Sequence, residues 1–196
     1  MIKPTVEQLI KTLTRLGHKV FVDGDYNLNM VGIRKDHQAS NRFDDTFCLF
    51  FKENGAAWII HYWPMTTDPG WHHLEHGLAK GTAVLKEGQY LGAYKIGPHR
   101  GQYSALVQAK PVTVYRDRNG DHNLDLENPE TGLFGINIHR ANSARPSVQV
   151  DQWSAGCQVL ADPLDFAALM GWARISAQAW GEYFTYTLIR EDDLKG

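Results

Sequence analysis

Short apolar runs separated by glycine, proline and polar turns make up most of the sequence, and they restrict the fold more than any other feature. The runs are rich in β-branched and aromatic residues, which favour strands. They cover residues 19–23, 26–34, 46–51, 56–63, 83–85, 89–97, 104–108, 112–115 and 184–190. The turn Glu53-Asn-Gly predicts a hairpin between two of these runs. Many short strands indicate a mainly β or α+β domain.

Two stretches have helical periodicity instead. The first begins at Thr5, which fits a capping box with Gln8, and it ends at Gly17. The second covers 164–180 and begins after Asp162-Pro. We therefore expect a mainly β or α+β fold with an N-terminal helix and one long helix near the end of the chain.

The composition is typical of one globular domain. Hydrophobic residues make up 43% and charged residues 21% of the 196 residues, and there is no internal repeat or low-complexity tract. We expect a single domain over 1–196, with 1–45 as a candidate N-terminal appendage packed on it. The formal net charge of −2 and the lack of a basic block exclude nucleic acid as an expected partner. The sequence gives no indication of oligomeric state.

The N-terminus, Met1-Ile-Lys-Pro-Thr, lacks the apolar region of a signal peptide, and no segment is apolar enough to span a bilayer. We expect a protein that is made in the cytoplasm and is not inserted into a membrane. Action at the cell wall would then require lysis or specialised export.

The two cysteines predict different environments and no disulfide framework. Cys48 lies in an apolar run and is expected to be a buried structural thiol. Cys157 follows Ser154-Ala-Gly, and a neighbouring strand-like segment carries His139. An imidazole can take the thiol proton and stabilise the thiolate, which is the minimum for nucleophilic catalysis. Gly156 permits a tight turn that directs the Cys157 N–H at an oxyanion.

The order and spacing of these residues resemble the active-site signature of the L,D-transpeptidase (YkuD-like) family, which is a His, an interval of this size and then Ser/Thr-His-Gly-Cys. Fourteen residues separate His139 from Ser154. The resemblance covers 131–159 closely. It implies that Cys157 is the nucleophile and His139 the imidazole that activates it, with Ser154 and Gly156 in the same motif. It also implies a β-rich L,D-transpeptidase-like domain in which the long helix follows the cysteine.

Two positions depart from the family pattern. Ala155 occupies the place of the family's second His, and Gln158-Val159 replaces the usual Asn or Arg after the cysteine. Gln158, His99 and Tyr103 are candidates to replace the missing imidazole, and Trp153 is well placed to shape the site. The expected substrate-binding residues are therefore Trp153, Arg140, Gln158, His99 and Tyr103.

The resemblance implies cysteine-dependent acyl transfer or hydrolysis on peptidoglycan stem peptides through a thioester on Cys157. The acceptor is an amine in a transpeptidase and water in an L,D-carboxypeptidase or endopeptidase, and the implied catalysis requires no cofactor. The N–H groups of Gly156 and Cys157 are the expected oxyanion donors. A backbone carbonyl near Arg140 or the side chain of Asp151 would orient His139. A phage-encoded wall enzyme, a secretion-system effector and a cytoplasmic carboxypeptidase that trims muropeptides all fit this chemistry.

A second set of residues has the spacing of cation ligands. Oxygen-bearing side chains at alternate positions resemble the start of an EF-hand or dockerin calcium loop. The predicted ligands are Asp117, Asn119, Asp121, Asn123 and Asp125. His122 stands where such a loop has its turn glycine, and Asn128 stands at its acidic closing position. A structural calcium ion and a solvated Asx-rich turn are both open alternatives.

His72, Glu75 and His76 form the pattern H-x-x-E-H of inverted zinc peptidases. Pro69-Gly70 precede this segment and Gly77 follows it, which leaves barely two helical turns. A zinc peptidase is thus an alternative enzyme. The non-enzyme alternative is a β-rich binding module or virion component with a structural calcium ion.

Overall fold

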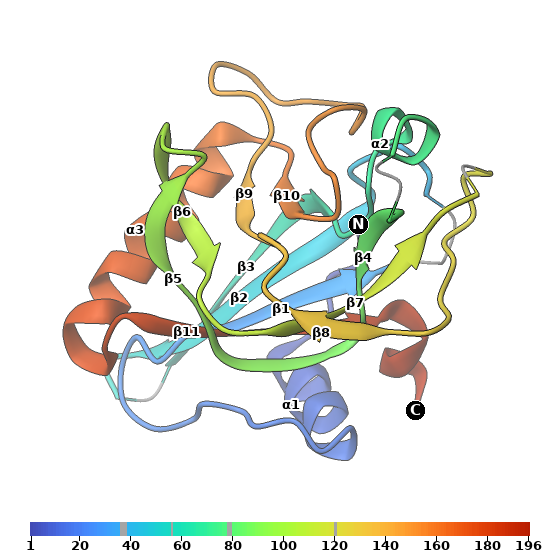
Figure 1. Ribbon diagram of the computed structural model, residues 1–196. Helices are drawn as coiled ribbons and strands as arrows, with labels where there is room; N and C mark the ends of the chain where they lie inside the picture. Colours follow the sequence, from blue (N-terminus) through green and yellow to red (C-terminus); the bar gives the residue numbers. More distant parts are fainter. Residues whose placement is uncertain (36–38, 56, 78–79, 120) are drawn as a thin grey trace.

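The computed structural model describes residues 1–35, 39–55, 57–77, 80–119 and 121–196. Within these residues eight strands close into a barrel (Figure 1). In the order in which they neighbour one another, they are β1 (Asn29–Arg34), β11 (Tyr183–Arg190), β5 (Gly88–His99), β6 (Tyr103–Gln108), β9 (Ile138–Arg140), β10 (Gln158–Leu160), β3 (Ala57–Thr66) and β2 (Asp45–Glu53).

A smaller sheet and the helices complete the fold. The sheet has the order β4 (Thr82–Leu85), β7 (Val112–Asp117) and β8 (Glu130–Gly132). The helices are α1 (Val6–Arg15), α2 (Trp71–Glu75), α3 (Pro163–Trp180) and a final 3₁₀ turn, Glu191–Lys195. The long connection from β9 to β10 extends above one end of the barrel, on the same side as α2 (Figure 1). Cys157 ends this connection.

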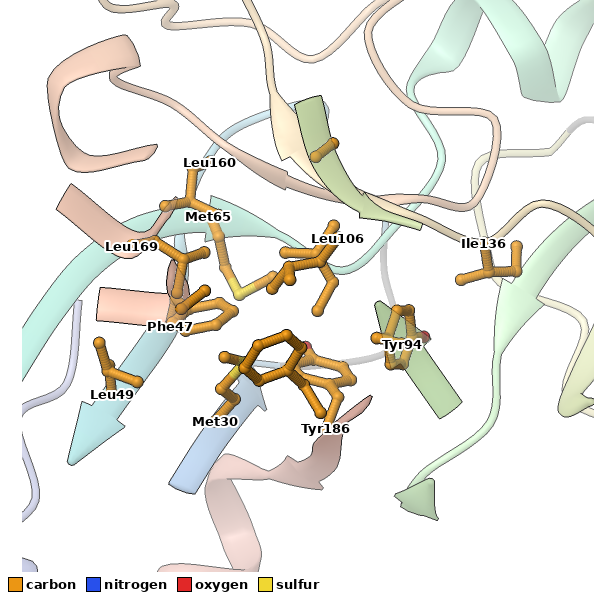
Figure 2. Close-up of a cluster of buried hydrophobic side chains, with 14 of the residues drawn as sticks. Met30, Phe47, Leu49, Met65, Tyr94, Leu106, Ile136, Leu160, Leu169 and Tyr186 are labelled. Atoms are coloured by element: carbon orange, nitrogen blue, oxygen red, sulfur yellow. The ribbon is translucent and has the colours of Figure 1, made fainter. Parts of the chain in front are cut away.

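Strand β2 is buried on both faces because it separates two cores. Phe47, Leu49 and Phe51 belong to the main core of the barrel, part of which is drawn in Figure 2. Cys48 and Phe50 alternate with them and belong to a second core, which α1 covers. Alternate side chains of a strand point to opposite faces, so a strand between two cores needs a continuous apolar run. Cys48 is therefore a buried structural thiol, as predicted.

Helix α1 begins with the predicted capping box. Thr5 Oγ1 accepts a hydrogen bond from the Gln8 N–H at 3.2 Å, and Gln8 Oε1 accepts one from the Thr5 N–H at 2.8 Å. These bonds satisfy two backbone donors that a helix start leaves free. Val6, Leu9 and Leu13 are buried in the second core. The helix thus covers the outer face of β1, β2 and β11.

Helix α3 follows the segment that carries Cys157, as predicted. Asp162 Oδ1 caps it by accepting the Leu164 N–H at 2.8 Å. Phe166, Leu169 and Met170 are buried in the main core. The predicted fold class, a mainly β domain with an N-terminal helix and one long late helix, is confirmed.

The first predicted strand pair is wrong. Residues 19–23 form no strand, and β1 begins at Asn29 rather than at Tyr26. The Asn29 side chain donates to the Phe21 carbonyl and accepts its N–H, both at 2.8 Å, and so replaces ladder bonds in this segment. Tyr26 has a left-handed φ of 57°, which breaks extended structure.

The hairpin of β2 and β3 is confirmed, although Ala56 in its predicted second strand lies outside the described residues. Strand β1 lies in the barrel between β11 and β2. The candidate appendage, 1–45, is therefore divided between α1 on the outside and a strand of the barrel itself.

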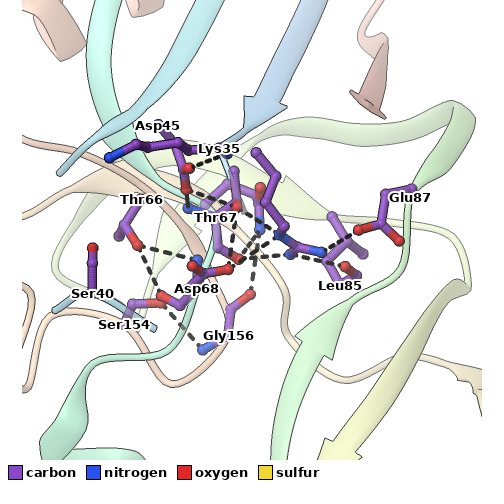
Figure 3. A network of polar contacts seen from close by, with 12 residues as sticks. Lys35, Ser40, Asp45, Thr66, Thr67, Asp68, Leu85, Glu87, Ser154 and Gly156 are labelled. Carbon is purple, nitrogen blue, oxygen red and sulfur yellow. Dashed lines mark hydrogen bonds and ion pairs between the residues drawn. The ribbon is translucent and has the colours of Figure 1, made fainter. Parts of the chain in front are cut away.

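A buried guanidinium at the end of β1 ties several loops together (Figure 3). The Arg34 side chain is fully buried. Its Nε lies 3.1 Å from Asp68 Oδ1, and its Nη1 lies 2.7 Å from Glu87 Oε1. Its Nη2 donates to the carbonyls of Thr67 at 3.1 Å and Leu85 at 3.0 Å. Each nitrogen of the guanidinium thus has at least one hydrogen-bond partner, which a buried cation requires.

Asp45 completes the network from β2. Its Oδ2 accepts the Thr67 N–H at 2.7 Å and the Thr67 hydroxyl at 2.8 Å, while its Oδ1 accepts the Lys35 N–H at 2.8 Å. Burial, followed by the charge of Asp45, raises the pKa of Asp68, and Arg34 opposes this increase. The segment after β3 is therefore held by charge-assisted hydrogen bonds from two other strands.

Replacing Arg34 by Met should destabilise the fold by about 3–5 kcal/mol, because it leaves buried carboxylates without their cation. Urea unfolding followed by tryptophan fluorescence would measure the loss. Arg145→Met, in the exposed part of the connection from β9 to β10, is the matched control and should leave the midpoint unchanged. Equal midpoints for the two variants would show that the network does not stabilise the fold.

Candidate active site

The parallel pairing of β9 and β10 brings the predicted thiol and imidazole to one end of the barrel. Val159 is the register partner of His139, and Gln158 that of Ile138. Cys157 directly precedes β10, two residues before the partner of His139. Two segments that are distant in sequence thus deliver the two groups to adjacent strands.

The protonation of His139 follows from its hydrogen bonds. Its Nδ1 lies 2.7 Å from the Arg140 carbonyl oxygen. A carbonyl only accepts, so Nδ1 carries the proton and Nε2 keeps a free lone pair. Of the two predicted orienting groups, the structure uses the backbone carbonyl. Asp151 instead accepts from Asn41 Nδ2 at 2.6 Å, and its own N–H donates to Asn41 Oδ1 at 2.7 Å.

Burial keeps the His139 imidazole neutral. The side chain is only 4% exposed. Desolvation, followed by the nearby His99, lowers the pKa of His139 to about 3. At neutral pH the ring therefore carries a single proton, on Nδ1, and Nε2 can act as a base.

His99 supplies a second imidazole at the end of β5. Its ring stacks on that of His139, with centroids 4.2 Å apart and planes at 25°. Asn137 Oδ1 accepts the Gln108 N–H at 2.8 Å, which leaves Asn137 Nδ2 to donate to His99 Nδ1 at 3.0 Å. The neutral His99 ring is therefore protonated on Nε2. Burial, followed by Arg100, lowers its pKa.

The turn before Cys157 is fixed by Ser154 and Gly156. Ser154 Oγ donates to the Cys157 carbonyl at 2.9 Å and accepts the Gly156 N–H at 3.2 Å. Gly156 has φ of +110°, and a Cβ there would lie 2.2 Å from the Ala83 carbonyl oxygen. Only glycine fits this position.

The hydrogen bond between the Gly156 N–H and Ser154 Oγ bears on the predicted oxyanion donors. The Gly156 N–H is already bonded to Ser154 Oγ, so its predicted role as an oxyanion donor is wrong in this conformation. The Cys157 N–H stays the predicted donor.

The Cys157 thiol is half-buried, whereas Cys48 is fully buried. Burial raises the pKa of Cys157, while a hydrogen bond from the Asn137 N–H and the charge of Arg100 lower it. The Sγ–H donates to the Gly135 carbonyl at 3.4 Å. The resting thiol is therefore protonated at neutral pH, and its reactivity depends on a base.

A pocket of about 400 Å³ adjoins His139. It is lined by His99, Arg100, Gln102, Tyr103, His139, Arg140, Ala141, Asn142, Ser143, Gln152 and Trp153. Four of the five predicted substrate-binding residues are in this lining: Trp153, Arg140, His99 and Tyr103. Their contact with a substrate stays a prediction.

The fifth, Gln158, does not reach the pocket. It is fully buried, and its Oε1 accepts the Tyr186 hydroxyl at 2.8 Å. Its register partner Ile138 belongs to the main core, which shows that this position faces the barrel interior. The prediction that Gln158 binds substrate is therefore wrong.

Two residues that affect this site, Asn137 and Arg100, were not predicted from the sequence. Asn137 precedes His139 by two residues in the same run, and Arg100 follows His99 directly. In an extended segment, side chains two residues apart point to the same face, so Asn137 could have been predicted to lie beside His139. Arg100 could not have been chosen without knowing that β5, β6 and β9 are neighbours.

The predicted calcium loop uses its side chains to bind its own backbone. Asn119 Oδ1 accepts the Asp121 N–H at 3.1 Å, and Asp121 Oδ1 accepts the Asn123 N–H at 2.8 Å. Asp117 Oδ2 accepts the Asp125 N–H at 3.2 Å. The first two bonds are Asx turns, and the third closes the loop between its ends. In the described part of the chain, no three His, Cys, Asp or Glu side chains are grouped to hold a metal ion. The calcium ion stays a prediction.

The H-x-x-E-H segment lies on α2, which has only five residues. The rings of His72 and His76 are 5.2 Å apart, but Glu75 Oε1 is paired with His122 Nε2 at 2.9 Å. The described residues supply no third ligand for zinc. The zinc peptidase therefore has less structural support than the cysteine site.

Two further findings concern the whole chain. Among the described helices, none is long and apolar enough to cross a membrane. Comparisons with protein-family models, with curated proteins and with solved structures find no match to this chain. The fold is a β-barrel domain that carries His139 and Cys157 on adjacent segments, and both the cysteine–histidine site and the family resemblance stay predictions.

Replacing His99 by Gln should raise the pKa of His139, because the stacked imidazole disfavours the charged form of its neighbour. Burial remains, so the new value should still lie below the usual ~6.5. NMR titration of the histidine ring protons would measure it. His76→Gln, at an exposed position, is the control and should leave the titration of His139 unchanged. An unaltered pKa in the His99 variant would contradict the electrostatic coupling.

Proposed function

We propose that this protein is a cysteine enzyme that transfers or hydrolyses acyl groups of peptidoglycan stem peptides. The substrate class comes from the resemblance of the segment from His139 to Cys157 to the L,D-transpeptidase signature. One observation carries the catalytic part. His139 is a buried neutral imidazole whose Nδ1–H is fixed on the Arg140 carbonyl. Its Nε2 is therefore unprotonated and is the proposed acceptor of the thiol proton, and its strand β9 pairs with β10, which Cys157 directly precedes.

The chemistry follows from these protonation states. His139 Nε2 takes the thiol proton while Sγ attacks the peptide carbonyl, which forms the C–S bond and a tetrahedral oxyanion. The imidazolium then gives its proton to the leaving amine as the C–N bond breaks, and a thioester remains on Cys157. An amine or a water molecule, deprotonated by the same imidazole, attacks the thioester and releases the thiol.

The resting site is neutral, since burial raises the pKa of Cys157 and lowers that of His139. Proton transfer is therefore coupled to attack on a bound substrate rather than completed beforehand. The thiol must first turn away from the Gly135 carbonyl, to which it donates at rest. The charge of Arg100 lowers the pKa of Cys157 and favours the thiolate as it forms.

The decisive experiment is mass spectrometry of muropeptides after incubation with the protein. Wild type should shorten or cross-link stem peptides, and Cys157→Ala should abolish the change. His139→Gln should lower kcat by about 10²–10⁴-fold, which is the usual contribution of a general base. Cys48→Ala is the control and should keep its activity once its folding is verified. Unchanged processing by Cys157→Ala would refute the proposal, and loss of processing only with a chelator would favour the zinc alternative.

Thiol labelling provides a test that needs no substrate. Iodoacetamide should modify native Cys157 and spare Cys48, because Cys48 is fully buried and burial raises its pKa. Peptide mapping by mass spectrometry would report both sites. In urea both cysteines should be labelled, which controls for detection. Equal labelling of the two thiols in the native protein would contradict the assignment of Cys157 as the reactive one.

A further inference from the structure

The pocket beside His139 is lined by cations without a carboxylate. Its charged side chains are those of Arg100 and Arg140, and the two histidines of the lining are neutral at pH 7 because burial lowers their pKa values. Among the described residues, neither arginine forms an ion pair with Asp or Glu. Two guanidinium groups therefore face one pocket with no counter-charge from the chain itself.

Arg140 is held in place by Tyr103. Its guanidinium carbon lies 3.8 Å from the centre of the Tyr103 ring, and the Tyr103 hydroxyl donates to the Arg140 carbonyl at 3.3 Å. Stacking on an aromatic ring leaves the N–H edge of a guanidinium available for a planar acceptor. The fork is thus oriented before any ligand arrives, which lowers the entropic cost of binding.

Arg100 lies in the tight turn between β5 and β6, with a left-handed φ of 50°. Arg100 lines the pocket together with its chain neighbour His99 and with Trp153 of the connection before β10. Its charge also lowers the pKa values of His139 and Cys157. Arg100 and the His139 ring therefore line the same pocket, so a substrate bound there can contact both.

We infer that Arg100 and Arg140 form a recognition site for a carboxylate of the substrate, adjacent to the carbonyl that Cys157 attacks. This inference rests on the proposed function and narrows its substrate to acidic peptides. Guanidinium groups bind carboxylates through paired, charge-assisted hydrogen bonds. A pocket of one sign of charge also concentrates anions near its walls. Trp153 supplies an apolar wall for the rest of the ligand.

Binding to the Cys157→Ala variant of the full chain separates recognition from turnover. The probes are a synthetic stem tetrapeptide with free carboxylates and the same peptide with every carboxylate amidated. Calorimetry should show that amidation weakens binding at least about tenfold, the effect of losing one hydrogen bond to a charged group. Arg100→Gln and Arg140→Gln should each weaken binding of the free acid by a similar factor and leave the amide unaffected. Arg145→Gln is the matched control.

The outcomes distinguish this inference from the proposed function. Equal binding of acid and amide, equal weakening of both by the arginine variants, or no binding of either peptide would overturn the carboxylate site. Selective binding of the acid with no turnover by wild type would keep the site and refute the catalysis. Inorganic phosphate that competes better than acetate would show a general anion site and overturn the carboxylate assignment. Arg100→Gln, on an exposed turn, keeps the test valid if Arg140→Gln does not fold.

Discussion

The buried guanidinium of Arg34 is the interaction on which the position of the candidate nucleophile depends. It donates to the Thr67 carbonyl at 3.1 Å, and the Gln158 side chain donates to the same oxygen at 3.4 Å. Gln158 also accepts the Tyr186 hydroxyl and directly follows Cys157. An unpaired buried charge would be very costly, so the contacts of Arg34 must form together. A polar network in the core thus fixes the backbone that carries the thiol.

Burial sets the chemistry of the site as well as its geometry. It lowers the pKa of His139 and raises that of Cys157, so the pair is neutral before substrate binds. The charge of Arg100 lowers the pKa of the thiol and so favours the thiolate that the proposed attack requires. Desolvation therefore keeps the Cys157 thiol protonated and the His139 ring neutral. In the proposed reaction, the charge of Arg100 would reduce the free energy needed to form the thiolate.

The sequence predicted correctly the contacts between residues that are close in the chain. It did not predict the side-chain directions that depend on how distant strands pair. The capping box at Thr5 and the cap at Asp162 are contacts within one turn of a helix, and both were predicted. Gln158 was misplaced because its direction depends on pairing with Ile138, twenty residues earlier. The start of β1 was predicted wrongly because the Asn29 side chain, rather than a neighbouring strand, forms hydrogen bonds with the backbone of Phe21. Arg100 reaches the site only because three strands are neighbours in the barrel.

The stacked imidazoles suggest how a site with alanine at position 155 would work. Ala155 is exposed at the turn, and the second imidazole comes from His99 on β5, which packs on His139 at 4.2 Å. Two imidazolium ions at this distance repel each other strongly, so the pair holds at most one added proton near neutral pH. The proposed base accepts one proton from the thiol and then gives it to the leaving amine, so the pair needs to hold only one added proton. His99 would make the imidazolium short-lived and thereby favour the second transfer.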